Sequence, residues 1–401
     1  MHCGHADGVK QIQRDLFEVT EALCATAARA LGARSGAAPK LVWTDGRSRL
    51  AAMVAHVHGI GPLLDSFEWD APDPLRAELR QQAAGSRARA VRLLAVRDSI
   101  VAALRESGVE PIALKGAAFA ETLYAAPGLR PMADLDFLIA ETDAEACDRA
   151  ALSAGLTRSS ASDRHIVYAL EPTRIVALLR EDPDNPIKLE VHRRLAEAFW
   201  GVPYDITGAF RRADRPVGHC LHGLLHCSHH ASVRTLRFCQ VADLALLLAN
   251  LVPRDLASLV AALRACGGLG WAYAPLKLVE GYFPGVVDAG MVAETARAAP
   301  ALARHARRWT ISELSFCALG DGGIAIRLRW APTLLAAARG LLRHALDQGG
   351  ARSELAAEFQ SGRYGRATRG LAWLLGRGVR PVSARLVELA LAAPPAEAGA
   401  P

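Results

Sequence analysis

Two aspartates stand two residues apart in Asp134-Leu135-Asp136, at the start of an apolar run that is typical of a buried strand. Successive side chains of a strand point to opposite faces, so both carboxylates project from one face, about 7 Å apart along the backbone. Carboxylate oxygens bind hard divalent cations such as Mg²⁺, and two such ions can flank the attacking and leaving oxygens of a phosphoryl transfer. The spacing therefore predicts metal-assisted phosphate chemistry.

A third acidic side chain of interest is Glu190, in the middle of the strand-like run Ile187–His192. A charge at such a position is expensive to bury without a partner, which favours a role as a third metal ligand. The alternative is that Glu190 faces solvent. His192 lies two residues further on, so it points to the same face and could orient the Glu190 carboxylate through a hydrogen bond.

A candidate phosphate-binding turn lies at Lys115-Gly116, directly after the short apolar run Ile112–Leu114 and before a segment with helical periodicity. Backbone N–H groups at the start of a helix attract anions, and Lys115 adds a positive charge. The alternative is that Lys115 is an ordinary solvated cation.

The segments that must position these residues mix short strands with helices. Helical periodicity dominates from Val9 to Leu104 and returns after Leu195. Between them the pattern predicts helices over 87–107, 115–124 and 142–154, and strands over 112–114, 134–140, 165–170, 174–179 and 187–192. We therefore expect an α+β fold with a small mixed sheet.

The expected organisation has four parts. We expect a helical lead-in over residues 1–90, an α/β core over 91–195, a large all-helical C-terminal module over 196–390, and a disordered tail over 391–401. The tail contains only Ala, Pro, Gly and Glu from Ala392 onward. The helical module would cover the cleft of the core and supply an acceptor pocket.

The order of the motifs resembles that of the nucleotidyltransferase superfamily typified by DNA polymerase beta. More closely, the chain resembles an uncharacterised family of bacterial nucleotidyltransferases often found beside genes for natural-product and cell-surface biosynthesis. The resemblance spans roughly residues 95–385 and depends on Leu114-Lys115-Gly116, Tyr124, Arg130, Asp134 to Ile139, and Leu189 to His192. Toxin-antitoxin nucleotidyltransferases share nearly the same arrangement.

This resemblance implies roles for the acidic residues. Asp134 and Asp136 would ligate both metal ions, Mg²⁺ or Mn²⁺. Glu190 would ligate the ion that activates the acceptor, and it could also serve as the base. In-line attack would then release pyrophosphate.

The resemblance also implies roles for the cationic residues. Lys115 and Arg130 would neutralise the triphosphate, and the alternative for Arg130 is a salt bridge to a neighbouring aspartate. Ala117 follows Gly116 where superfamily members usually carry Ser or Gly, so backbone amides would have to bind the phosphates. Tyr124 is more typical of a core tyrosine with a solvated hydroxyl than of a direct participant.

A histidine-rich helix is expected around residues 219–230. His222, His226, His229 and His230 recur at spacings that place them on one helical stripe, which could bind zinc or copper. No carboxylate interrupts the stripe and no H-E-x-x-H arrangement is present. His226 and His229 are candidates for contacts to the active site or substrate, and a purely structural role as polar filling between packed segments is the favoured alternative.

An arginine-rich segment runs from Arg363 to Arg385, with no acidic residue between Glu358 and Glu388. Such a helix can contact an anionic membrane or RNA, but it is more often a solvated face. The formal net charge of +6 is small for 401 residues and does not by itself indicate a nucleic-acid partner.

The compartment follows from the termini, the cysteines and the apolar runs. Residues 1–10 lack the basic and apolar regions of a secretory signal, and the eight cysteines contain no C-x-x-C pair. No apolar run is long enough to span a membrane, because Asp243 interrupts Val241–Val252. We expect a cytoplasmic protein with reduced thiols.

Three functions remain open from the sequence. The favoured one is Mg²⁺-dependent transfer of a nucleoside monophosphate from an NTP such as ATP to an unidentified small molecule, peptide or RNA end. The second is a catalytically silent relative that binds a nucleotide or peptide as an accessory factor in a biosynthetic pathway. The third is a transferase acting on tRNA ends, which predicts steeply salt-dependent binding.

Overall fold

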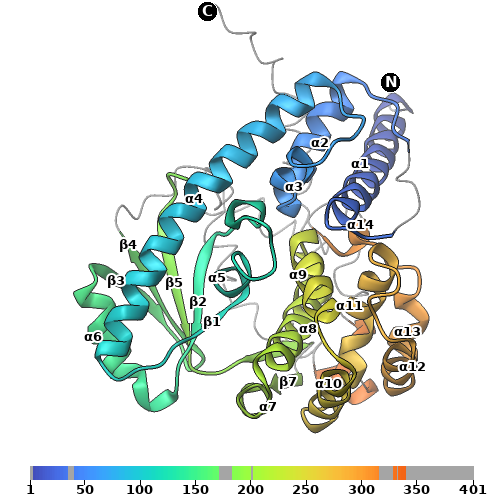
Figure 1. The fold of residues 1–401 in the computed structure, drawn as a ribbon. Coiled ribbons are helices and arrows are strands. Elements are labelled where there is room, and N and C mark those ends of the chain that lie inside the picture. Colours follow the sequence, from blue (N-terminus) through green and yellow to red (C-terminus); the bar gives the residue numbers. More distant parts are fainter. Residues whose placement is uncertain are drawn as a thin grey trace, which may run out of the picture.

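The fold was analysed in a computed structural model (Figure 1). It describes residues 3–34, 40–170, 183–199, 202–315, 328–331 and 333–339. The predicted strand over 174–179, the arginine-rich segment from Arg363 to Arg385 and the predicted tail over 391–401 lie outside the described residues.

Four helices precede the sheet. They are α1 (Cys3–Ala30), α2 (Asp45–His58), α3 (Gly61–Asp65) and α4 (Asp73–Glu106). Helix α2 begins after Thr44, whose side chain accepts a hydrogen bond from the backbone N–H of Arg47. It ends at Gly59, which adopts a left-handed conformation with φ 64° that glycine tolerates without steric cost. Local capping thus sets both ends of this helix.

The core contains a mixed sheet of five strands in the order β1-β2-β5-β4-β3. Its strands are β1 (Ile112–Leu114), β2 (Asp134–Leu138), β3 (Leu156–Ala161), β4 (His165–Leu170) and β5 (Ile187–His192). Strands β2 and β5 are parallel, and the other neighbouring pairs are antiparallel. β4 and β5 have the predicted bounds, whereas β3, exposed along most of its length, was not predicted.

Short helices connect the strands. They are α5 (Lys115–Phe119), the 3₁₀ turns η1 (Pro127–Leu129) and η2 (Glu141–Asp143), and α6 (Ala144–Ser153). The helix predicted to continue to Tyr124 therefore ends at Phe119. Beyond it the chain forms turns that lead through η1 to Arg130 and β2.

The two faces of the sheet differ in chemistry. Leu135, Phe137, Leu189 and Val191 are buried in one apolar cluster with residues of α4 and α6. The alternate positions carry the polar residues identified from the sequence, because the side-chain period of a strand is two. The polar face therefore looks away from α4 and α6.

The C-terminal part begins with a two-stranded hairpin, β6 (Ala196–Phe199) and β7 (Val202–Asp205), and then continues as helices. The pattern after Leu195 predicted helices only, so the hairpin is an addition to that prediction. The helices are α7 (Thr207–Arg212), α8 (Arg215–Val233), α9 (Phe238–Ala249), α10 (Pro253–Ala265), α11 (Leu269–Tyr282), α12 (Ala289–Ala298), α13 (Pro300–Ala306) and α14 (Ile311–Leu314).

The N-terminal helices pack on the C-terminal helices, as Figure 1 shows for α1 beside α14. One apolar cluster contains residues of α1, α2, α8, α9 and α11, together with Leu114 and Leu138 from the polar face of the sheet. Helix α4 contributes Leu75 and Leu79 to this cluster, and further along it contributes Leu93 to the cluster beneath the sheet. The proposed boundary at residue 90 therefore falls inside a continuous helix that joins both clusters.

Two further properties concern the described residues only. Within them, no helix combines the length and the apolar character needed to cross a membrane. Six cysteines among them have free thiols: Cys24, Cys147, Cys220, Cys227, Cys239 and Cys266.

Candidate active site

The polar face of the sheet brings the acidic residues together through strand register. In the parallel pair β2 and β5, Asp136 lies opposite Glu190, Asp134 opposite Lys188, and Leu138 opposite His192. Paired residues of neighbouring strands project on the same side. The Asp-x-Asp and Glu-x-His motifs thus share one face at the centre of the sheet.

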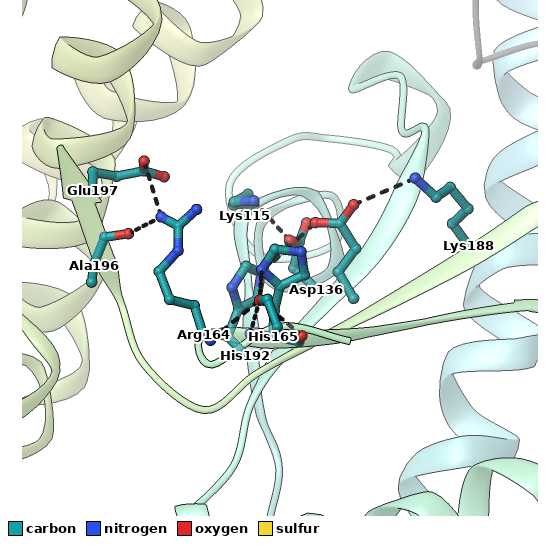
Figure 2. Close-up of polar contacts among 10 residues, drawn as sticks. Lys115, Asp136, Arg164, His165, Lys188, His192, Ala196 and Glu197 are labelled. Atoms are coloured by element: carbon teal, nitrogen blue, oxygen red, sulfur yellow. Dashed lines mark hydrogen bonds and ion pairs between the residues drawn. The ribbon is translucent and has the colours of Figure 1, made fainter. Parts of the chain in front are cut away.

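Asp136 is the most buried member of this group, with 2% of its surface exposed. Its Oδ1 atom lies 2.7 Å from Nζ of Lys115 and 2.8 Å from Nε2 of His192 (Figure 2). Burial alone would raise the pKa of Asp136, but the Lys115 ammonium and the His192 hydrogen bond together hold it well below its usual range. Asp136 is therefore ionised at neutral pH.

Three side chains could jointly hold a metal ion. Asp136, Glu190 and His192 each offer one ligand atom, and these atoms all lie within 4.8 Å of one another. Nε2 of His192 is 4.0 Å from Oε2 of Glu190, and Nζ of Lys188 is 3.7 Å from Oε1 of Glu190. Glu190 is half-buried with these partners, so the alternative of a solvent-facing glutamate does not describe it.

Asp134 lies on the same strand face but outside this three-residue group. It is half-buried, and desolvation together with the negative charges of Asp136 and Glu190 raises its pKa to about 7. The group that the structure assembles therefore contains His192 where the sequence analysis expected Asp134.

Lys115 reaches Asp136 from a strained turn. It directly follows β1 and has a φ of 48°, a left-handed conformation that costs a non-glycine residue of order 1–3 kcal/mol. Burial would lower the pKa of its ammonium, but the charges of Asp136, Glu190 and Asp134 raise it above its usual value. The turn thus places a permanent positive charge among the carboxylates.

Gly116 is buried within the same turn. A Cβ atom added there would lie 2.9 Å from Cγ of Met132 and 3.2 Å from Nη1 of Arg130. This close approach explains why the position has no side chain. Helix α5 has only five residues, so the anion attraction expected from a helix start is small here and Lys115 supplies the charge.

Arg130 and Tyr124 contact Asp243, which the sequence analysis did not place among the site residues. Nη2 of Arg130 donates to Oδ2 of Asp243 at 2.6 Å, and the Tyr124 hydroxyl donates to Oδ1 of Asp243 at 2.7 Å. The guanidinium predicted to meet the triphosphate is thus paired with an aspartate on α9. This matches the alternative of a salt bridge, although its partner is 113 residues away.

The sequence contained one signal for Asp243. It is the single acidic residue in the apolar helix Phe238–Ala249, where an unpaired carboxylate would be costly to bury. That signal excluded a membrane span, but it did not reveal which residues would pair with Asp243.

The histidines of α8 contact side chains from different elements, α9 and the β6–β7 hairpin. Nε2 of His226 lies 2.9 Å from Nε2 of Gln240, and Nδ1 of His229 lies 3.2 Å from Oε2 of Glu197. Figure 2 shows Glu197 on the hairpin side of the site, where it lies 3.5 Å from Arg164. Among the described residues, the groups spaced for a metal ion include none of these histidines.

Two of these histidines still lie within electrostatic reach of Lys115. Burial and the electrostatic effects of Lys115 and His192 lower the pKa of His222, and burial, His230 and Lys115 lower that of His226. Both imidazoles are therefore neutral at physiological pH, and helix α8 presents uncharged rings toward the polar face.

A sequence profile of a family described as uncharacterised nucleotidyltransferases matches residues 47–284, more than half of the chain. The chain belongs to this family. The matched range contains β1 to β5, Lys115, the carboxylates and Asp243. Comparison with curated proteins and with solved structures found no match. Membership in a nucleotidyltransferase family suggests a transferase with a nucleoside triphosphate as substrate, and it confirms the family expected from the motifs.

Proposed function

We propose that this nucleotidyltransferase-family protein transfers a nucleoside monophosphate from an NTP to a hydroxyl or phosphate acceptor, with a divalent metal ion. The main support is the register of Asp136 opposite Glu190, with Lys115 and His192 both at Oδ1 of Asp136. This arrangement combines metal ligands with a cation for the triphosphate on one face of the sheet.

The donor set fits a divalent ion. Asp136, Glu190 and His192 would hold it, with Asp134 as a further candidate on the same face. Carboxylate oxygens suit both Mg²⁺ and Mn²⁺, and the imidazole favours Mn²⁺. The ion would supply charge stabilisation at the phosphate oxygens.

The residues of the chain would divide the remaining tasks. Lys115, which carries its charge permanently, would bind the triphosphate oxygens. The acceptor oxygen would attack the α-phosphorus as the bond to pyrophosphate breaks, and Glu190 would receive the proton of the acceptor. Lys188, 3.7 Å from Glu190, would limit repulsion between that carboxylate and the phosphates.

A titration by calorimetry tests this proposal without knowledge of the acceptor. The four NTPs are titrated into the protein with Mg²⁺, Mn²⁺ or a chelator. We expect metal-dependent binding of at least one NTP, weakened about tenfold or more in Asp136→Asn. Asp98→Asn, which changes a carboxylate on α4 that is 68% exposed, is the matched control and should bind as the wild type does.

The other functions predict different outcomes. Binding that does not require the metal, or that survives Asp136→Asn, contradicts the proposed site. Metal-dependent binding with no pyrophosphate release in the presence of any acceptor favours the accessory function. RNA binding whose affinity falls steeply with salt favours a tRNA-directed transferase.

A further inference from the structure

Tyr124, Arg130 and Asp243 form a buried group, here named the Asp243 cluster, between the sheet and helix α9. Nε of Arg130 lies 3.2 Å and 3.1 Å from the two carboxylate oxygens of Asp243, and Nη2 lies 2.6 Å from Oδ2. The side chains of Arg130 and Asp243 are 10% and 7% exposed. Such a paired contact fixes the position of the guanidinium plane.

Tyr124 and Arg130 donate further hydrogen bonds within and next to the cluster. Asp243 accepts the Tyr124 hydroxyl on Oδ1, and Nη1 of Arg130 donates to the backbone oxygen of Pro131 at 2.6 Å. Burial opposes the charge of Arg130, but Asp243 raises its pKa well above the usual value. The guanidinium thus stays charged and is held from both sides.

Arg130 in turn contacts the turn that presents Lys115. Its Nη1 atom is 3.2 Å from the place of a Cβ atom at Gly116, so the guanidinium packs directly on that backbone. Lys115, the preceding residue, has the left-handed φ of 48° and brings its Nζ atom to 2.7 Å from Asp136. A strained backbone persists where its surroundings hold it, and Arg130 is part of those surroundings.

We propose that Asp243 is a positioning residue for the triphosphate site: through Arg130 it holds the Lys115-Gly116 turn so that the ammonium lies at Asp136. Helix α9 of the C-terminal part, which carries Asp243, then determines where the Lys115 ammonium lies over the polar face of the sheet. One test of this inference, NTP affinity, rests on the proposed function. The other test, hydrogen exchange of the Lys115-Gly116 turn, does not depend on it.

The variants are chosen to separate positioning from stability. Asp243→Asn keeps the shape of the side chain but removes its charge, and Tyr124→Phe removes one hydrogen bond to it. Tyr282→Phe is the matched control, because the Tyr282 hydroxyl donates to Oε2 of Glu21 at 2.6 Å between α11 and α1. Asp243→Glu tests whether a carboxylate on a longer side chain restores the effect.

The first readout is hydrogen exchange of the peptide over 112–119 without nucleotide, at a temperature where every variant is folded. We expect faster exchange of this peptide in Asp243→Asn than in Tyr282→Phe, with Tyr124→Phe between them and partial restoration by Asp243→Glu. Equal protection in Asp243→Asn and the wild type overturns the proposal, whatever the protein does with nucleotides.

The second readout is NTP affinity by calorimetry. We expect Asp243→Asn to raise the Kd about tenfold or more and Tyr282→Phe to leave it within twofold, although both lower the Tm. A lower Tm with unchanged Kd in Asp243→Asn means that the cluster is only structural, and overturns the proposal. If the wild type binds no NTP, the proposed function fails and hydrogen exchange alone decides on positioning.

Discussion

His192 on β5 contacts Asp136 on the neighbouring strand β2: its Nε2 atom lies 2.8 Å from Oδ1 of Asp136, although the residue that pairs with His192 in the register is Leu138. The imidazole nitrogen is therefore close enough to the carboxylate oxygens of Asp136 and Glu190 to bind the same metal ion. Carboxylates alone suit Mg²⁺, whereas nitrogen donors favour transition metals. We therefore expect the contact between His192 and Asp136 to influence which ion binds at the proposed site.

The first prediction is that Mn²⁺ binds more tightly than Mg²⁺ and that His192 is one of its ligands. Pulsed electron paramagnetic resonance of the Mn²⁺-loaded protein should show coupling to an imidazole nitrogen, and His192→Ala should lose it. The control is His165→Ala, whose ring centroid lies 5.7 Å from that of His192 on the adjacent strand and which is outside the three-residue group. Coupling that survives in His192→Ala would show that the imidazole is not a ligand.

The second prediction concerns the charge of Lys115. Lys115→Met should weaken NTP binding about tenfold or more, because the triphosphate loses a cation. It should also reduce the free energy of unfolding by about 1–3 kcal/mol, since Asp136 loses a buried partner while Lys115 itself is partly exposed.

The matched control is Lys277→Met on α11, where the lysine pairs with Glu280 at a more exposed position. That substitution should cost no more than about 0.5 kcal/mol and leave NTP binding intact. Calorimetry and denaturant titration measure both quantities. Wild-type NTP affinity in Lys115→Met would remove Lys115 from the proposed site.

The third prediction compares two glycines. Gly116→Ala should destabilise the protein by about 1–3 kcal/mol, because its Cβ would press on Met132 and Arg130. Gly281→Ala, near the end of α11, meets nothing within 4 Å and should stabilise the protein by up to about 1 kcal/mol. Denaturant midpoints with equal slopes would establish both changes, and a neutral Gly116→Ala would mean that the turn tolerates a side chain.

The fourth prediction is a loss of stability in mild acid that depends on His58. This side chain is fully buried on α2 and accepts a hydrogen bond from the backbone N–H of Phe238. Burial, aided by the charge of Arg237, lowers its pKa from 6.5 to about 3. Between these values the unfolded chain binds a proton that the folded chain does not, so stability is complete above pH 6.5 and falls as the pH decreases.

From pH 6.5 to pH 5, His58 should account for about 2 kcal/mol of this loss. Denaturant titrations across this range measure it, with His58→Gln as the variant in which that part of the slope disappears. A His58→Gln protein with the same pH slope as the wild type would assign the acid sensitivity to other groups.

The local pattern of the sequence determined the elements that bear the site and the faces on which its residues lie. The bounds of β4 and β5 could be predicted because alternation and turn residues mark short strands within a few residues of the chain. The same period of two placed Asp134 with Asp136 and Glu190 with His192. The family could be inferred because its motifs are local too.

Only the tertiary structure decided which of these elements are neighbours. Parallel pairing of β2 and β5 places Asp136 opposite Glu190, and packing of α9 on the core gives Arg130 its partner Asp243. A pattern along the chain specifies a residue's own face, whereas its partner depends on packing between distant segments, here 56 residues apart for Asp136 and His192 and 113 for Arg130 and Asp243. For that reason the sequence predicted the acidic residues of the candidate site, and the fold showed that Arg130 pairs with Asp243 and that His192 lies beside Asp136.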